Sequence, residues 1–312
     1  MSEFGKIYLA GHAGLLGKSV YQEFISENYE VVTRNSSDLD LRIEKDVSDF
    51  IEYIRPDGVI FCAARAGGIG YNVQDPLEMF HQNSQIQYAL FKVAQKLKIR
   101  KLIFISSAAV YPSNKNLNIE EDIFSGAPSL EHMQYALAKL SGMEMVRLVR
   151  ERNSLDWVSL ITTNIYGEND KWDKNRGHVI PALIMKILEA KSTNSPEVLV
   201  WGSGEASREF LHAKDAGKAI FKVYQSISNS KYDRYNLGGG IEVSIGELAK
   251  KISELCNYEG KLIFDSSQPE GPKARSLDIN RLKHFIDWQP EILLQDGLKL
   301  SINSFLKFSS QK

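Results

Sequence analysis

The sequence predicts an α/β fold with a doubly wound parallel sheet, and three observations support this prediction. Short apolar runs alternate with helical patterns through residues 6–162, an order typical of βαβ units with right-handed crossovers. A glycine-rich turn separates the first apolar run from the first helical pattern, as in Rossmann-type folds. After residue 165 the pattern becomes irregular. We therefore expect a core at residues 1–165 and a smaller region at 166–312, with some later chain returning to the core.

Composition limits the classes of protein that fit this chain. The 312 residues are 43% hydrophobic and 25% charged, with a net charge of −1, which is ordinary for a globular protein and offers no basic surface to nucleic acid. No apolar run is long enough to span a bilayer, and the first strand begins too early to leave room for a signal peptide. Two distant cysteines and six scattered histidines predict neither a disulfide nor a metal site. We therefore expect a protein of a reducing compartment, the cytoplasm.

The first strand is expected at residues 6–10, and Gly11, Gly14 and Gly17 follow it as a G-x-x-G-x-x-G turn. Glycines permit a tight turn and let the backbone approach a pyrophosphate. The first helix, at about 15–28, would begin at Leu15 and Leu16 and offer its N-terminal amide hydrogens to the phosphates. The turn therefore predicts a bound dinucleotide, with a merely tight turn as the alternative.

The second strand, residues 30–33, ends at Arg34. Many nucleotide-binding folds place an acidic residue here to hold the ribose 2′-hydroxyl of NAD, whereas a cation suits the 2′-phosphate of NADP. Arg34 therefore favours NADP, although a surface charge at a strand end would look the same. A helix is expected next, near residues 44–54.

The third strand, residues 58–62, runs into small residues that begin with Ala63 and Ala64. Small side chains at the carboxyl end of a strand let a cofactor pass close to the backbone. We therefore expect both alanines to contact the cofactor. An amphipathic helix follows at about 76–97.

Ser107 follows the fourth strand, residues 101–105. Catalytic groups of open α/β sheets lie beyond such strand ends, which favours a catalytic hydroxyl over a turn or helix-cap serine. A fifth strand is expected at 157–162, and a helix of the later region at about 178–190.

Tyr135 and Lys139 lie in a run of helix formers at residues 131–152. Residues four apart share a helix face, so the phenol and the ammonium point into the same space. A nearby ammonium stabilises the phenolate and lowers the pKa of the phenol from about 10. The pair therefore predicts a general acid for a carbonyl oxygen that is being reduced, although such pairs also occur by chance on solvated helices.

The glycine turn, Ser107 and Tyr135-x-x-x-Lys139 together resemble the extended short-chain dehydrogenase/reductase family that acts on nucleotide sugars. Over nearly its whole length the chain is similar to the GDP-L-fucose synthases within that family. The resemblance implies NADPH as cofactor, a GDP-linked keto sugar as substrate and a homodimer that pairs through two long helices, near 76–97 and 132–152. The further motifs that carry it are Ala63–Ile69, Val110–Pro112, Thr163–Gly167, His178–Leu183, Val200–Gly204 and Arg208–His212.

The resemblance also implies roles for single residues. Ser107 and Tyr135 would hydrogen-bond the C4 carbonyl of the sugar, Tyr135 would give the proton, and Lys139 would hold the nicotinamide ribose. His178 matches the acid of the family's C3/C5 epimerisation. Asn164 is expected beside both cofactor and substrate. The other positions at which the family contacts the GDP-sugar are Val179, Lys186, Trp201, Arg208 and Arg275.

Ala109 departs from the family pattern. The family has a cysteine two residues after the catalytic serine as the base that removes the C3 and C5 protons, and a methyl group cannot take a proton. We therefore expect an NADPH-dependent C4-ketoreductase of a GDP-4-keto-6-deoxy sugar, a hexose or a heptose, without C3/C5 epimerase activity. The alternatives are a bifunctional GDP-L-fucose synthase with another base, a nucleotide-sugar 4-epimerase that recycles bound NAD, and a non-catalytic nucleotide sensor.

Overall fold

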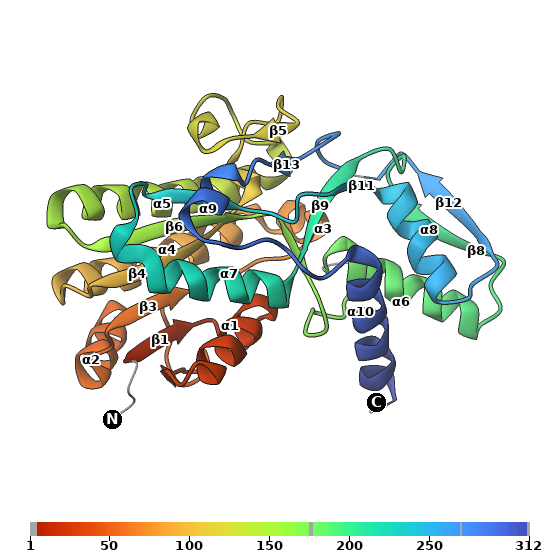
Figure 1. Ribbon diagram of the computed structural model, residues 1–312. Helices are drawn as coiled ribbons and strands as arrows, with labels where there is room; N and C mark the ends of the chain where they lie inside the picture. Colours follow the sequence, from red (N-terminus) through yellow and green to blue (C-terminus); the bar gives the residue numbers. More distant parts are fainter. Residues whose placement is uncertain (1–4, 175–176, 269, 311–312) are drawn as a thin grey trace.

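The computed structural model describes residues 5–174, 177–268 and 270–310, and in this part of the chain a six-stranded parallel sheet forms the core. Its strand order is β10-β6-β4-β3-β1-β2, and β6, β4, β3 and β1 lie side by side in Figure 1. The predicted α/β fold with a doubly wound sheet is confirmed. The strands are β1 (Lys6–Ala10), β2 (Glu30–Val32), β3 (Gly58–Phe61), β4 (Lys101–Ser107), β6 (Asp156–Thr162) and β10 (Arg234–Leu237).

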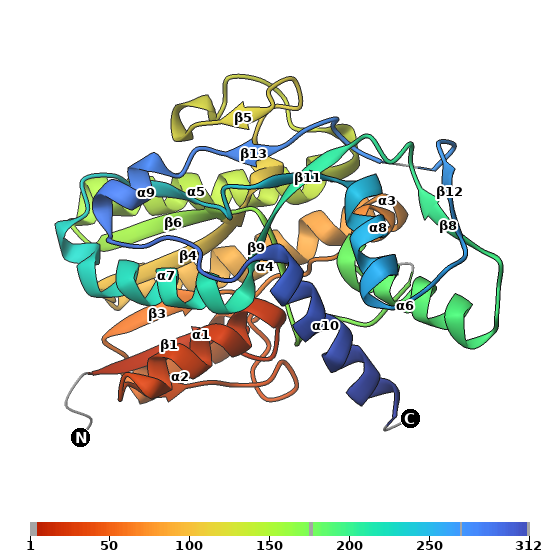
Figure 2. The same ribbon diagram turned by 45° about the vertical axis from the view of Figure 1, so that its right-hand side comes forward.

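Helices cover both faces of this sheet because its strands are apolar on both sides. On one face α1 packs beside α7, where Phe24 meets Phe221 with ring centroids 5.1 Å apart. On the other, α4 packs between α2 and α5 (Figures 1 and 2). Phe91 of α4 lies 5.2 Å from the Phe104 ring of β4. The helices are α1 (Leu15–Ser26), α2 (Glu44–Ile54), α4 (Pro76–Lys96), α5 (Met133–Asn153) and α7 (Ala213–Ser226).

The chain after residue 165 builds a second hydrophobic core and also returns to the main sheet through α7 and β10. The second core lies among three helices and two small sheets, of order β11-β9-β7 and β12-β8. The division at residue 165 itself stays a prediction. The remaining elements are β5 (Leu117–Asn118), β7 (Asn164–Tyr166), α6 (Val179–Ser192), β8 (Glu197–Trp201), β9 (Ser207–His212), β11 (Glu242–Ser244), α8 (Ile245–Leu255), β12 (Lys261–Asp265), β13 (Ser276–Leu277), α9 (Asn280–Phe285) and α10 (Leu294–Ser309).

The helices α7 to α10 of the later region were not expected from the sequence, and neither was one short helix, α3 (Ile69–Gln74). Three glycines in its first turn and before it hide the helical pattern, since glycine is a poor helix former. The side chain of Asn72 replaces this weak propensity with hydrogen bonds, because its amide donates to the carbonyl oxygens of Gly67 and Gly68. In the part of the chain that the structure describes, no helix is long and apolar enough to cross a membrane.

Candidate active site

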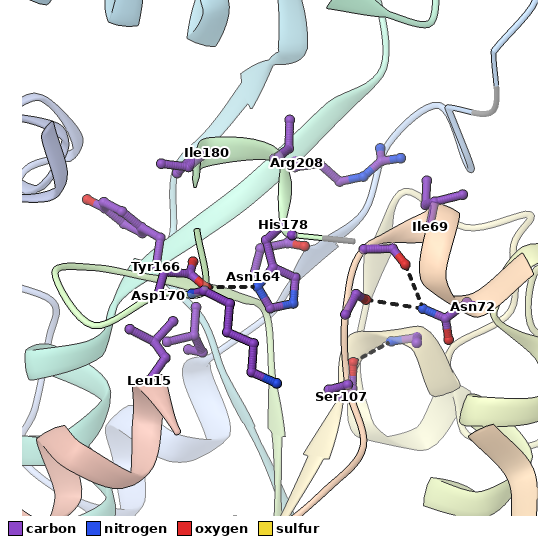
Figure 3. A pocket seen from close by; sticks show the side chains of 18 of the residues that line it. Leu15, Ile69, Asn72, Ser107, Asn164, Tyr166, Asp170, His178, Ile180 and Arg208 are labelled. Carbon is purple, nitrogen blue, oxygen red and sulfur yellow. Dashed lines mark hydrogen bonds and ion pairs between the residues drawn. The ribbon is translucent and has the colours of Figure 1, made fainter. Parts of the chain in front are cut away.

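A cavity of about 420 Å³ lies at the carboxyl ends of β1, β3, β4 and β6, between the sheet and the later region. This is the edge at which open α/β sheets bind ligands. Figure 3 shows its walls, with Ser107 and Asn72 on one side and Asp170 and Tyr166 on the other. The predicted site residues that line it are Gly11, Gly14, Leu15, Leu16, Gly17, Ala64, Ser107, Tyr135, Lys139, Asn164, His178, Val179, Lys186, Trp201, Arg208 and Arg275.

The glycine turn forms a backbone cradle at the start of α1. A methyl group on Gly17 would lie 2.1 Å from the carbonyl oxygen of Gly11, and Gly11 itself has φ +87°, so both positions require glycine. At Gly14 a methyl group would meet its nearest atom only at 3.5 Å. The cradle is therefore open on its Gly14 side, beside the N-terminus of a 12-residue helix. It fits the pyrophosphate of a dinucleotide.

Two predicted cofactor residues do not line this cavity. The backbone of Ala63 packs against Gly11, 2.6 Å from the place where a methyl group on Gly11 would lie. Arg34 is exposed beyond β2, donates to the carbonyl oxygen of Thr33 at 2.8 Å and lies over the Phe50 ring. Contact of either residue with a cofactor stays a prediction.

Ser107, Tyr135 and Lys139 come together in the cavity, from the end of β4 and the first turns of α5. Ser107 Oγ accepts from the amide of Ala109 at 3.2 Å and caps a 3₁₀ turn over Ala108–Val110. It is thus a cap serine that also faces the cavity. Lys139 Nζ donates to the carbonyl oxygen of Ile105 at 2.7 Å and lies 5.7 Å from the centre of the Tyr135 ring.

The expectation that Lys139 lowers the pKa of Tyr135 is wrong for this structure. Burial raises the pKa of Tyr135, and it lowers the pKa of Lys139 to about 7, because leaving water penalises the charged form of each group. The lysine ammonium is bonded to a backbone carbonyl rather than to the phenol. Tyr135 is accordingly a protonated phenol at neutral pH, which suits a proton donor.

Ala109 is buried and is one of the residues that line the cavity. Cys62 also lines the cavity, and burial raises the pKa of its thiol to about 12. A thiol with so high a pKa is a poor base and a poor nucleophile at neutral pH. Cys62 therefore offers no replacement for a reactive cysteine at position 109.

The cations of the later region form the far wall of the cavity. Lys186 Nζ lies 5.2 Å above the Trp201 ring. Arg208 donates to the carbonyl oxygens of Ser207, Glu270 and Pro272. Burial, followed by the charge of the nearby Arg208 guanidinium, lowers the pKa of Arg275 to about 10. Arg275 Nη2 has no hydrogen-bond partner among the described residues. The buried Arg275 guanidinium and the half-buried Arg208 guanidinium together are complementary to a polyphosphate.

Several polar residues of the cavity were not predicted from the sequence, among them His132 and Asp170. His132 precedes Tyr135 by one helical turn, and burial, followed by the nearby Arg275 guanidinium, lowers its pKa to about 4. Asp170 lies in the loop after β7, with Oδ1 3.4 Å from His178 Nδ1. The spacing of His132 from Tyr135 was a usable signal, whereas the Asp170 contact depends on a loop without regular spacing. Among the described residues, no group of three or more His, Cys, Asp or Glu side chains is placed to hold a metal.

Comparison with known proteins agrees with this geometry. Residues 7–238 match the model of the NAD dependent epimerase/dehydratase family. The chain belongs to this family. It is 32% identical over 311 residues to the GDP-L-fucose synthase of Escherichia coli strain K12, with 97% of each chain covered. The predicted resemblance to the extended short-chain dehydrogenase/reductases is thereby confirmed, and the chain is an oxidoreductase.

Two solved structures of similar proteins have the same fold as this chain. A GDP-6-OMe-4-keto-L-xylo-heptose reductase from Campylobacter jejuni superimposes with a TM-score of 0.90 at 26% identity, covering 100% of this chain and 99% of that chain. A GDP-mannoheptose C4 reductase from the same organism, solved with NADP bound, gives a TM-score of 0.87 at 26% identity, covering 98% and 99%. The bound NADP of the second structure agrees with the cofactor predicted for this chain.

Proposed function

We propose that this protein is an NADPH-dependent C4-ketoreductase of a GDP-4-keto-6-deoxy sugar, a hexose or a heptose, without C3/C5 epimerase activity. The observation that carries the proposal is the meeting of Ser107, Tyr135 and Lys139 in one cavity with the methyl group of Ala109 beside them. The E. coli relative makes GDP-L-fucose, and two of the similar structures are GDP-heptose reductases. A GDP-sugar is therefore the substrate class that the relatives have in common.

The chain's own residues supply the proton chemistry. Bound NADPH supplies the hydride for reduction at C4. Ser107 Oγ and the Tyr135 phenol donate hydrogen bonds to the C4 oxygen, which orients the carbonyl and stabilises the negative charge that develops on it. Tyr135 then gives its proton to the resulting alkoxide. Lys139, once protonated, stabilises the phenolate that remains.

The wall of cations explains why a nucleotide diphosphate would be held with its sugar near Ser107. Arg208, Arg275 and Lys186 all line the cavity, and the N-terminus of α6 opens into it at His178 and Val179. Helix N-termini and guanidinium groups both bind phosphate oxygens. The sugar would then lie between this wall and β4.

A bifunctional GDP-L-fucose synthase is the second candidate, because His178 remains in the cavity in contact with Asp170. Against it stands Ala109, which cannot take a proton. A nucleotide-sugar 4-epimerase is a third candidate, and it differs in needing no net supply of reductant.

Proton NMR of one reaction separates the three candidates. The purified protein is incubated in deuterated water with NADPH and GDP-4-keto-6-deoxymannose, and a keto-heptose substrate is run in parallel. A C4-ketoreductase consumes one NADPH per product and leaves the configurations at C3 and C5 unchanged. Inversion with deuterium at C3 and C5 identifies a GDP-L-fucose synthase. A 4-epimerase leaves the keto sugar unreduced and consumes no NADPH, and in a further parallel tube it inverts C4 of a GDP-hexose that carries a C4 hydroxyl. Tyr135→Phe is the control, expected to lower kcat on the order of 10²–10⁴-fold.

We also propose a homodimer that pairs through α4 and α5. Leu77 and Tyr88 of α4 and Leu137 of α5 are 64%, 55% and 45% exposed, and large apolar side chains on neighbouring helices are typical of an interface. Light scattering of the wild type and of Tyr88→Glu tests the pairing, since a carboxylate at this face should yield monomer. The two cysteines are both unpaired, which supports the cytoplasm as the proposed location.

A further inference from the structure

His178 and Asp170 meet in the cavity although nothing in their sequence spacing requires it. His178 precedes the first residue of α6, and its Nδ1 lies 3.4 Å from Oδ1 of Asp170. Figure 3 shows the dashed line between them and the imidazole ring projecting into the space across which Ser107 lies. A carboxylate only accepts hydrogen bonds, so Nδ1 must be the donor in this contact. The other ring nitrogen, Nε2, is then left for the cavity.

Asp170 is itself held firmly. Its side chain is 4% exposed, and Oδ1 accepts from the amide of Lys171 at 2.8 Å. Two residues earlier, Glu168 pairs with Lys214, and its backbone oxygen accepts from Ser304 of α10. Two residues later, the ring of Trp172 packs 5.0 Å from that of Phe305. The loop is therefore anchored to α7 and α10 on both sides of Asp170.

The carboxylate of Asp170 is poorly satisfied where it lies. Its second oxygen, Oδ2, is buried and has no hydrogen-bond partner among the described residues. A buried carboxylate that lacks donors costs free energy, and fold stability alone would favour an apolar residue at such a place. The group that gains from it is the imidazole, which the carboxylate orients, as in other His–Asp pairs.

We infer that Asp170 is a positioning residue that fixes the ring orientation and tautomer of His178, so that His178 Nε2 hydrogen-bonds a hydroxyl of the substrate sugar. This inference rests on the proposed function and deepens it. The Nε2 contact on one side and Ser107 with Tyr135 on the other would hold the sugar at two points. The C4 carbonyl would then stay aligned even though Ala109 offers no contact beyond a methyl group.

The test is a double-mutant cycle with Asp170→Asn, His178→Gln and both changes together. Asparagine keeps the shape of the side chain and removes the charge. Each single change should lower kcat/KM about 10–100-fold, mainly through kcat, since a small misplacement of the reacting carbon is costly. The double variant should be no slower than His178→Gln alone, because a positioning residue has nothing left to position.

Two controls separate positioning from a general structural defect. Asp49→Asn makes the same chemical change on the exposed face of α2, where the carboxylate pairs with Lys45, and should leave kcat/KM unchanged. Asp170→Glu keeps a carboxylate and should recover part of the lost kcat. Thermal unfolding and NADPH affinity should match the wild type in every variant. Losses that multiply in the double variant, or an Asp170→Asn variant as fast as the wild type, would overturn the inference.

A readout without turnover keeps the inference separate from the proposed function. Nitrogen-15 NMR of the histidine side chains, with the His178 signal assigned by its absence in His178→Gln, reports which ring nitrogen carries the proton. We expect Nδ1–H in the wild type and its loss in Asp170→Leu, because asparagine would keep the Oδ1 acceptor at this place whereas leucine has no acceptor. If no GDP-4-keto sugar is reduced, the proposed function fails while this result still decides the role of Asp170. If the sugar is reduced and the tautomer is unchanged in Asp170→Leu, the inference alone fails.

Discussion

Replacing Lys139 with methionine tests whether burial lowers the pKa of the Lys139 side chain. Lys139 is 2% exposed, and burial lowers its pKa from 10.5 to about 7. Below pH 7 the ammonium is charged in both the folded and the unfolded chain, so the folded protein carries the full cost of the buried charge. Between pH 7 and 10.5 the folded protein has released the proton that the unfolded chain still binds. The free energy of unfolding should therefore rise with pH through this window.

The size of the rise follows from the two pKa values. The step from 10.5 to about 7 corresponds to roughly 5 kcal/mol at 1.36 kcal/mol per pH unit. The Lys139→Met variant has a side chain of similar length without the charge, so it should lack this rise. It also leaves the carbonyl oxygen of Ile105 without its donor, which costs about 1–3 kcal/mol at every pH. This cost lowers the free energy of unfolding by the same amount throughout and does not change its slope with pH.

Urea unfolding of both proteins from about pH 6 to about pH 10 measures the difference. Contributions from other titrating groups cancel in the comparison. The advantage of Lys139→Met should be largest at the acidic end and shrink steadily toward the alkaline end. Lys250→Met, on the exposed face of α8, is the matched control and should run parallel to the wild type. Parallel curves for Lys139→Met as well would refute the reasoning, because they would mean that Lys139 titrates as it does in water.

Three further changes test the cofactor cradle, the cofactor preference and the missing base. Gly17→Ala places a methyl group 2.1 Å from the Gly11 carbonyl oxygen, so we expect a lower melting temperature and no NADPH binding. Gly14→Ala should keep the melting temperature and weaken only the affinity measured by NADPH fluorescence; equal behaviour of the two variants would contradict the cradle. Arg34→Asp should raise the KM for NADPH by about tenfold or more relative to NADH, because a carboxylate repels the 2′-phosphate, and an equal change in both KM values would exclude Arg34 from the phosphate site. Ala109→Cys returns a thiol two residues after Ser107 and should introduce deuterium at C3 or C5 of the product, whereas unchanged NMR spectra would show that a thiol alone is insufficient.

Five strands of the main sheet, β1, β2, β3, β4 and β6, were predictable together with the helices beside them, because each depends on a short run of residues. The helix expected at residues 44–54 is α2 without change, and the first strand is β1 at its expected bounds. The helix α3 was not predictable in this way, because its glycine-rich residues have little helical propensity and the hydrogen bonds of the Asn72 side chain stabilise it instead. Ser107 lies in β4 rather than after it, because the strand continues to pair with β6 as far as Thr162.

The sequence by itself determined the glycine cradle, the shared helix face of Tyr135 and Lys139, and the methyl group at Ala109. Each follows from local rules: a strand end leads into a turn, residues four apart share a helix face, and a side chain's chemistry is fixed by its type. Only the tertiary structure decided that burial keeps Tyr135 protonated and lowers the pKa of Lys139, and that Asp170 reaches His178. Burial and loop contacts depend on the packing of segments far apart in the chain, and no spacing within the sequence encodes them.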